Sequence, residues 1–143
     1  MKPASKLALL AVLGSFPGTV VRYAPPRFSG RFALTLIIDS SPSSPASAMS
    51  GTVVLSPVAA AGTPTATGRY RVPLGGSGLG PDEGPAMARA IASDSAEIVL
   101  NPSARGPRID LAGRWRLGGL EGRWVSVGGG RAAGGRFSLR AAR

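Results

Sequence analysis

Large apolar residues occupy every second position in several short segments of the chain. In residues 31–38 one parity carries Phe32, Leu34, Leu36 and Ile38, and the other carries arginine, alanine and threonine at 31, 33 and 35. Side chains alternate between the two faces of a β-strand, so this pattern predicts a strand with one buried face. Similar segments predict further strands at 51–56, 68–74, 97–100, 109–117, 120–127 and 135–140.

The segments between these strands predict loops and one short helical insert. Residues 40–47 are rich in serine and proline, without apolar period, which is typical of an exposed connection. Residues 75–84 form a glycine-rich loop that lacks the endings of phosphate-binding loops, and we expect a mobile flap over one barrel end. Residues 85–91 are compatible with two helical turns, with Asp82 or Glu83 near their N-terminus.

The last three predicted strands are joined by short glycine-containing linkers at 118–119 and 128–134. Tight hairpins use glycine because it adopts positive φ easily, so these strands predict an antiparallel meander. With the earlier segments the count reaches about seven or eight strands, enough for a sheet to curl and hide its edges. We therefore predict an all-β fold: an antiparallel meander forming a closed or partly open barrel with one short helical insert.

A tripeptide of glycine, arginine and an aromatic residue occurs at 30–32, 68–70, 113–115, 122–124 and 135–137. Residues two apart in a strand share a face, so each glycine lies on the side of the aromatic ring and leaves space beside it. The arginine between them points the other way. The tripeptide therefore predicts aromatic rings inside the barrel and arginines outside.

Two of these tripeptides, Gly113-Arg114-Trp115 and Gly122-Arg123-Trp124, lie in the glycine-rich meander. This last third of the chain loosely resembles the calycin-type barrels, the lipocalins and avidins. The resemblance implies a barrel that holds a small apolar ligand in its mouth. Lipocalins carry Gly-x-Trp on their first strand, whereas here it falls on the expected fifth and sixth strands, so no ligand-contacting residue is carried over.

The composition excludes most familiar enzyme chemistry. Cysteine and histidine are both absent, which removes disulfides, thiolate nucleophiles, Ser-His-Asp triads and nearly all zinc sites. The seven carboxylates show no spacing that would bring an acid and a base together, as glycosidases require. We therefore expect a protein that is not an enzyme and that carries no cofactor and no metal.

The N-terminus has the pattern of an export signal. Lys2 and Lys6 accompany the apolar run 7–13, with a cut expected near Ser15. We therefore predict a signal peptide over residues 1–14, a single barrel-like domain over 15–143, and a secreted or periplasmic protein. The alternative is an internal start, with residues 19–23 pairing into the sheet. Pro17 and Gly18 interrupt the apolar run, which predicts no transmembrane span.

The aromatic residues of the tripeptides are the candidate ligand-binding residues. A small barrel sometimes holds one ligand, and more often is filled by its own side chains, so these rings are either the lining of a cavity or simply core. The candidates are Phe32, Tyr70, Trp115, Trp124 and Phe137.

The formal net charge is +10, and both lysines lie in the first six residues, so arginines supply the rest. A GC-rich coding sequence is one source of such a bias, and an anionic partner is the other. For the expected outward arginines, the first interpretation is a solvated face, and the second is a contact for an anionic envelope component. A nucleic-acid contact comes third, because such a site would normally need exposed aromatic residues. These candidate anion-contacting residues are Arg31, Arg69, Arg71, Arg114, Arg116, Arg136 and Arg140.

The function that these patterns favour is binding without catalysis. We expect an exported domain that takes a small apolar ligand in the barrel mouth. The alternative is a structural or adhesive envelope protein that contacts an anionic surface through its arginine-rich exterior. Nucleic acid is the least favoured partner, and the sequence leaves the identity of the ligand and the oligomeric state open.

Overall fold

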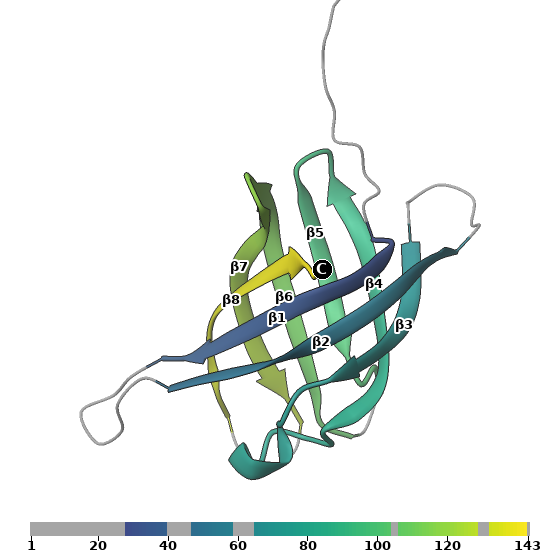
Figure 1. The fold of residues 1–143 in the computed structure, drawn as a ribbon. Helices are drawn as coiled ribbons and strands as arrows, with labels where there is room; N and C mark the ends of the chain where they lie inside the picture. Colours follow the sequence, from purple (N-terminus) through teal and green to yellow (C-terminus); the bar gives the residue numbers. More distant parts are fainter. Residues whose placement is uncertain (1–27, 40–46, 59–64, 104–105, 129–131, 143) are drawn as a thin grey trace, which may run out of the picture.

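Eight antiparallel strands, each hydrogen-bonded to the next one along the chain, close into a barrel (Figure 1). The computed structural model describes residues 28–39, 47–58, 65–103, 106–128 and 132–142. Pairing between the first and last strands closes the barrel. The strands are β1 Gly30–Ile38, β2 Ser47–Val58, β3 Thr65–Arg71, β4 Glu83–Ala92, β5 Ser95–Leu100, β6 Arg108–Arg116, β7 Gly119–Val127 and β8 Gly134–Ala141. The predicted all-β meander barrel is therefore confirmed.

The core lies inside the barrel and receives alternate side chains from every strand. Along β1, Phe32, Leu34 and Leu36 are buried, while the residues between them are exposed or half-buried. The indole N–H of Trp124 on β7 donates a hydrogen bond of 3.1 Å to the carbonyl oxygen of Ile37 on β1, past Gly135 of the intervening strand β8. A buried indole needs such a partner, because an unpaired buried donor is destabilising.

Glycines on the inward positions allow neighbouring strands to approach closely. A Cβ at Gly113 would meet the carbonyl oxygen of Glu121 and would lie 3.0 Å from Cζ of Phe137. A Cβ at Gly122 would likewise meet the backbone of β6 at Ala112. The tripeptide predicted that the glycine leaves space for a ring, and at Gly113 the ring of Phe137 occupies that space. The backbone contacts show that the glycines also accommodate the tight coiling of the barrel.

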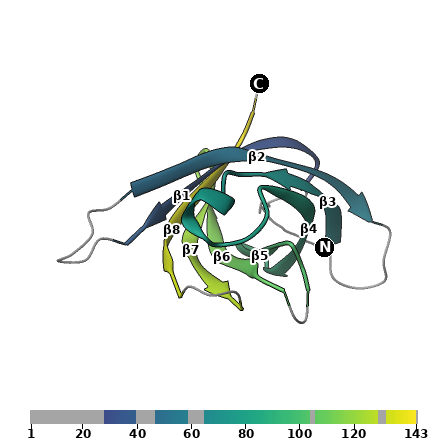
Figure 2. The same ribbon diagram turned by 90° about the horizontal axis from the view of Figure 1, so that it is seen from below.

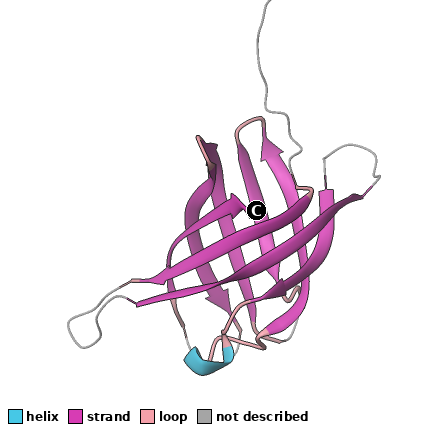
Figure 3. Ribbon diagram, in the orientation of Figure 1, coloured by secondary structure: helices cyan, strands magenta, loops and turns pink. Residues whose placement is uncertain are grey.

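The predicted location of the helical insert at residues 85–91 is wrong, because these residues belong to β4. The short insert is instead a 3-10 turn, η1 Gly75–Ser77, drawn in cyan in Figure 3. In β4 the buried inward side chains are small, Ala86 and Ala88, and the outward ones include the apolar Met87 and Ile91. Because the inward side chains are no larger than the outward ones, the period-two pattern of a strand is weak in this segment. Pairing with β3 and β5 overrides the helix propensity of alanine.

The glycine-rich segment closes one end of the barrel, as seen from below in Figure 2. We call residues 72–82 the closing segment and this end the closed end. Leu74 and Leu79 are buried in the core, and backbone hydrogen bonds link Val72 to Asp82 and Leu79 to Leu74. The expected place of this segment over a barrel end is thus observed. Its leucines pack inward, and its mobility stays a prediction.

The opposite end carries the β4–β5 and β6–β7 turns, and we call it the tip end (Figure 1). The predicted export signal, residues 1–14, and the alternative strand at 19–23 lie outside the described residues, as does most of the predicted connection at 40–47. Within the described ranges no helix is long and apolar enough to cross a membrane.

Candidate functional site

Among the described residues, six ion pairs lie on the outer surface of the barrel. Arginine and carboxylate approach within 2.6 Å in Arg123–Asp39 and within 3.8 Å in Arg114–Asp94, the shortest and longest pairs. Asp82 is the one carboxylate outside these six pairs, and it accepts a hydrogen bond from the backbone N–H of Gly75 at 2.7 Å. All seven Asp and Glu side chains of the chain are therefore engaged. The other four pairs are Arg71–Glu83, Arg89–Glu97, Arg108–Asp110 and Arg140–Glu121.

Four exposed arginines have no carboxylate partner among the described residues. They are Arg31, Arg69, Arg116 and Arg136. Each guanidinium offers five N–H donors in a planar fork that suits phosphate, sulfate or carboxylate groups. These side chains are therefore available to an external anion, whereas the paired arginines are already partly neutralised.

The strand register brings two of the unpaired arginines to either side of one apolar residue. Arg31 of β1 lies opposite Val54 of β2, and Val54 lies opposite Arg69 of β3. All three point outward, and Val54 is 44% exposed. One row further along, Arg71 faces Thr52 and pairs with Glu83 at 3.3 Å. Three neighbouring strands thus present a basic row with an apolar centre.

A second group of arginines lies beside the β6–β7 turn. Arg116 faces Gly119 across the hairpin, and Arg140 of β8 runs along the other side of the same glycine. The guanidinium of Arg140 covers Gly118, where a Cβ would collide with it, and Gly118 has a φ of 94°. Arg31 lies two residues from Ala33, the partner of Arg140 on β1. The arginine face is the set that these two groups form: Arg31, Arg69, Arg71, Arg116 and Arg140.

The predicted ligand-binding rings lie on the inner face of the barrel. Phe32, Tyr70, Trp124 and Phe137 are buried in the core. Trp115 is partly buried and packs against Phe28, with the ring centroids 5.5 Å apart. The four buried rings are therefore packed as core, and Trp115 is the ring of this set that reaches towards solvent, at the tip end.

Tyr70 links the core to the closing segment. Its hydroxyl donates a hydrogen bond to the carbonyl oxygen of Pro81 at 2.7 Å. Burial, with a smaller contribution from the negative charge of Asp82, raises the pKa of the Tyr70 phenol above its usual value. The phenol is therefore held in its neutral, hydrogen-bond-donating form.

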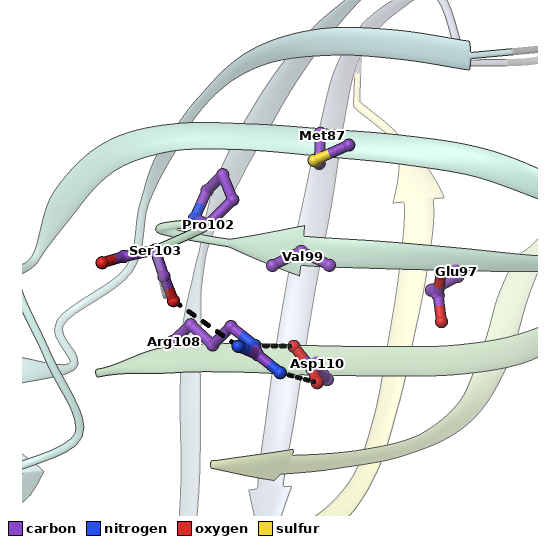
Figure 4. Close-up of a pocket in the computed structure, with 7 residues that line it drawn as sticks. All are labelled: Met87, Glu97, Val99, Pro102, Ser103, Arg108 and Asp110. Atoms are coloured by element: carbon purple, nitrogen blue, oxygen red, sulfur yellow. Dashed lines mark hydrogen bonds and ion pairs between the residues drawn. The ribbon is translucent and has the colours of Figure 1, made fainter. Parts of the chain in front are cut away.

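A shallow depression of about 310 Å³ lies on the outer surface between β4, β5 and β6 (Figure 4). Met87 and Val99 form an apolar part of its lining. Arg108 contacts both carboxylate oxygens of Asp110, at 2.9 and 3.3 Å, and this pairing raises the pKa of the Arg108 guanidinium. Glu97 is paired with Arg89 at 2.8 Å. The charged groups of the depression are thus engaged with protein partners, which makes it a weaker candidate than the arginine face.

The predicted anion-contacting arginines all lie on the outside, but they fall into two kinds. Arg71, Arg114 and Arg140 are ion-paired, whereas Arg31, Arg69, Arg116 and Arg136 are not. Arg136 lies apart from the arginine face, in a row with Ile37 and Arg123. Val54 and Leu117, both exposed beside these arginines, were not predicted as candidate site residues.

Comparisons with known proteins add no assignment to this geometry. No protein-family model, curated protein or solved structure matches the chain. Among the described residues, no three acidic, histidine or cysteine side chains are grouped so that they could hold a metal ion. The structure defines the fold class alone, a closed eight-stranded meander barrel.

Proposed function

We propose that this protein binds an anionic surface, without catalysing a reaction, through the arginine face. The observation that carries the proposal is the row Arg31–Val54–Arg69, in which both arginines lack a carboxylate partner among the described residues. An exposed arginine whose charge is not neutralised by its own protein attracts anions more strongly than an ion-paired one. This is the adhesive alternative of the sequence analysis, now narrowed to five of the outward arginines.

The arrangement of the arginine face supports contact with several anionic groups at once. Its side chains come from β1, β3, β6 and β8, so they spread over a broad surface and do not converge on one point. A single small anion would need converging donors, whereas a charged polymer or headgroup layer presents many phosphates or carboxylates in parallel. Electrostatic contact of this exposed kind is screened by salt.

The test is a charge reversal with a matched control. The double variant Arg31→Glu/Arg69→Glu should lose most binding to two anionic probes, phosphatidylglycerol-containing vesicles and dextran sulfate, measured by co-sedimentation and by affinity electrophoresis. Arg136→Glu also reverses an exposed, unpaired arginine but lies outside the arginine face, and it should bind nearly as well as the natural protein. Equal loss in both variants, or no binding of the natural protein to either probe, would refute the proposal.

A second candidate function is binding of a small apolar ligand at the barrel mouth. Trp115 favours it, because this ring is partly buried against Phe28 at the tip end. Energy transfer from tryptophan to an added fluorescent fatty acid should then saturate, and Trp115→Phe should raise the fatty-acid concentration at half-saturation several-fold whereas Trp124→Phe should not. Absence of saturable transfer in the natural protein would exclude this candidate.

A further inference from the structure

Two aliphatic side chains protrude from the tip end. Leu117, the first residue of the β6–β7 turn, is 99% exposed. Ile91 is 54% exposed near the end of β4, where a register shift between Ala90 and Ala92 interrupts pairing with β5. The backbone N–H of Trp115 bonds the carbonyl oxygen of Asp94 at 2.8 Å, so the two turns are joined side by side. A single exposed leucine is ordinary, but here two large aliphatic side chains are exposed at the same end of the barrel.

Three arginines lie on the strands that lead to and flank the β6–β7 turn. Arg116 directly precedes Leu117, Arg140 covers Gly118, and Arg31 lies on the neighbouring strand. Asp94 in the adjacent turn is paired with Arg114 at 3.8 Å, and Glu121 with Arg140 at 3.0 Å. Arg31 and Arg116 have no carboxylate partner in the described part of the chain. The tip end therefore combines an exposed leucine with unneutralised guanidinium groups set just behind it.

This combination distinguishes a lipid surface from other polyanions. A polysaccharide or a nucleic acid offers phosphates or sulfates but no apolar phase for Leu117, and nucleic-acid sites normally add exposed aromatic rings for base stacking. The large apolar side chains exposed in the described residues are all aliphatic. At an anionic bilayer, aliphatic side chains enter the headgroup and acyl boundary, while arginines remain at the phosphates.

We infer that the tip end docks on the surface of a lipid bilayer that contains anionic headgroups. Leu117 enters the boundary region, Ile91 lies beside it, and Arg31, Arg116 and Arg140 contact headgroup phosphates. This inference rests on the proposed function, names its partner, and narrows the contact to the part of the arginine face at the tip end. It also sets an orientation, because the closed end points away from the bilayer.

The first experiment separates lipid from charge. Leu117→Ser should lower partitioning into vesicles of phosphatidylcholine with phosphatidylglycerol several-fold, since the apolar contact is lost. It should leave dextran sulfate binding unchanged, because the arginines are intact. Val125→Ser is the matched control, since Val125 is 51% exposed on the outer face of β7 and away from the tip. This control should bind vesicles like the natural protein.

The second experiment reports insertion directly. The chain contains no cysteine, so Leu117→Cys and Val125→Cys each provide one labelling site for an environment-sensitive fluorophore such as NBD. Anionic vesicles should shift the emission of the label at position 117 to shorter wavelength, and spin-labelled lipid should quench it. The label at position 125 should show neither effect.

The outcomes separate the two proposals. The lipid inference is overturned, while the proposed function stands, if the protein binds both dextran sulfate and vesicles, Leu117→Ser partitions into vesicles like the natural protein, and vesicles do not shift the emission of the label at position 117. If the natural protein binds neither probe, both are overturned. Vesicle binding that depends on Leu117 and on anionic lipid supports both.

Discussion

The two ends of the barrel use their apolar residues in opposite ways. At the closed end, Leu74 and Leu79 fold back into the core, and the Tyr70 hydroxyl and the Asp82 carboxylate tie the closing segment down. At the tip end, Leu117 and Ile91 extend into solvent. Glycine occurs at both ends, at Gly118 of the tip end and at four positions of the closing segment, so its presence does not explain the difference.

The difference indicates which end contributes to stability and which is available for contact. Apolar side chains inside the barrel stabilise it by leaving water, roughly 1.5–3 kcal/mol for a fully buried leucine. Leu117 contributes none of this in the free protein, and burial against a partner would release that free energy on binding. The substitutions below test this division between the ends, from the largest expected effect to the smallest.

The two tryptophans should differ in their contribution to stability. Trp124→Ala should lower the free energy of unfolding by about 3–5 kcal/mol, because the ring is fully buried and its N–H bonds Ile37. Trp115→Ala should cost about 2 kcal/mol, since this ring is only partly buried at the tip end. Urea unfolding followed by circular dichroism measures both. Equal costs would contradict the packing difference.

The leucines of the two ends provide the most direct stability comparison. Leu79→Ala should destabilise the protein by about 2–4 kcal/mol, because it leaves a cavity under the closing segment. Leu117→Ala should change the free energy of unfolding by less than about 0.5 kcal/mol, as for other surface positions. Thermal and urea unfolding of the pair measure this contrast. A large cost at Leu117 would mean that the tip end is packed in solution.

Tyr70→Phe should have a smaller, pH-dependent effect. At neutral pH the variant loses the bond to Pro81, which costs about 0.5–1.5 kcal/mol. The folded protein raises the pKa of Tyr70, so the unfolded chain ionises this phenol first. The contribution of Tyr70 to the free energy of unfolding is therefore fully present below the usual tyrosine pKa of 10.0, and it is lost as the pH rises through the raised value. The difference between the natural protein and the variant should shrink in urea unfolding above that pH.

Period-two alternation predicted most of this fold from sequence. β1 and β6 to β8 were placed within one or two residues, because their inward side chains are large and their outward ones mostly polar. β4 was missed because Ala86 and Ala88 inside are no larger than their outward neighbours. The strand predicted to reach Leu117 ends at Arg116, because the two-residue turn begins one residue earlier, and Leu117 therefore faces solvent.

The sequence predicted which arginines point outward, but not which of them are ion-paired. The tripeptide placed the arginines outside, but the ionic partners depend on register between distant strands. Arg123 pairs with Asp39, 84 residues away, and Arg31 meets Arg69 only through Val54 of the strand between them. No local spacing carries this information. Which arginines remain unneutralised therefore follows from strand pairing alone.

A pair of fluorescent labels, one at each barrel end, tests the central claim most directly. Gly76 lies on the exposed side of η1 with open space for a Cβ, so Gly76→Cys labels the closed end as Leu117→Cys labels the tip end. With vesicles of phosphatidylcholine and phosphatidylglycerol, NBD at position 117 should shift to shorter wavelength and be quenched by spin-labelled lipid, while NBD at position 76 stays unchanged. Equal responses at both positions, or a response at position 76 alone, would contradict docking through the tip end.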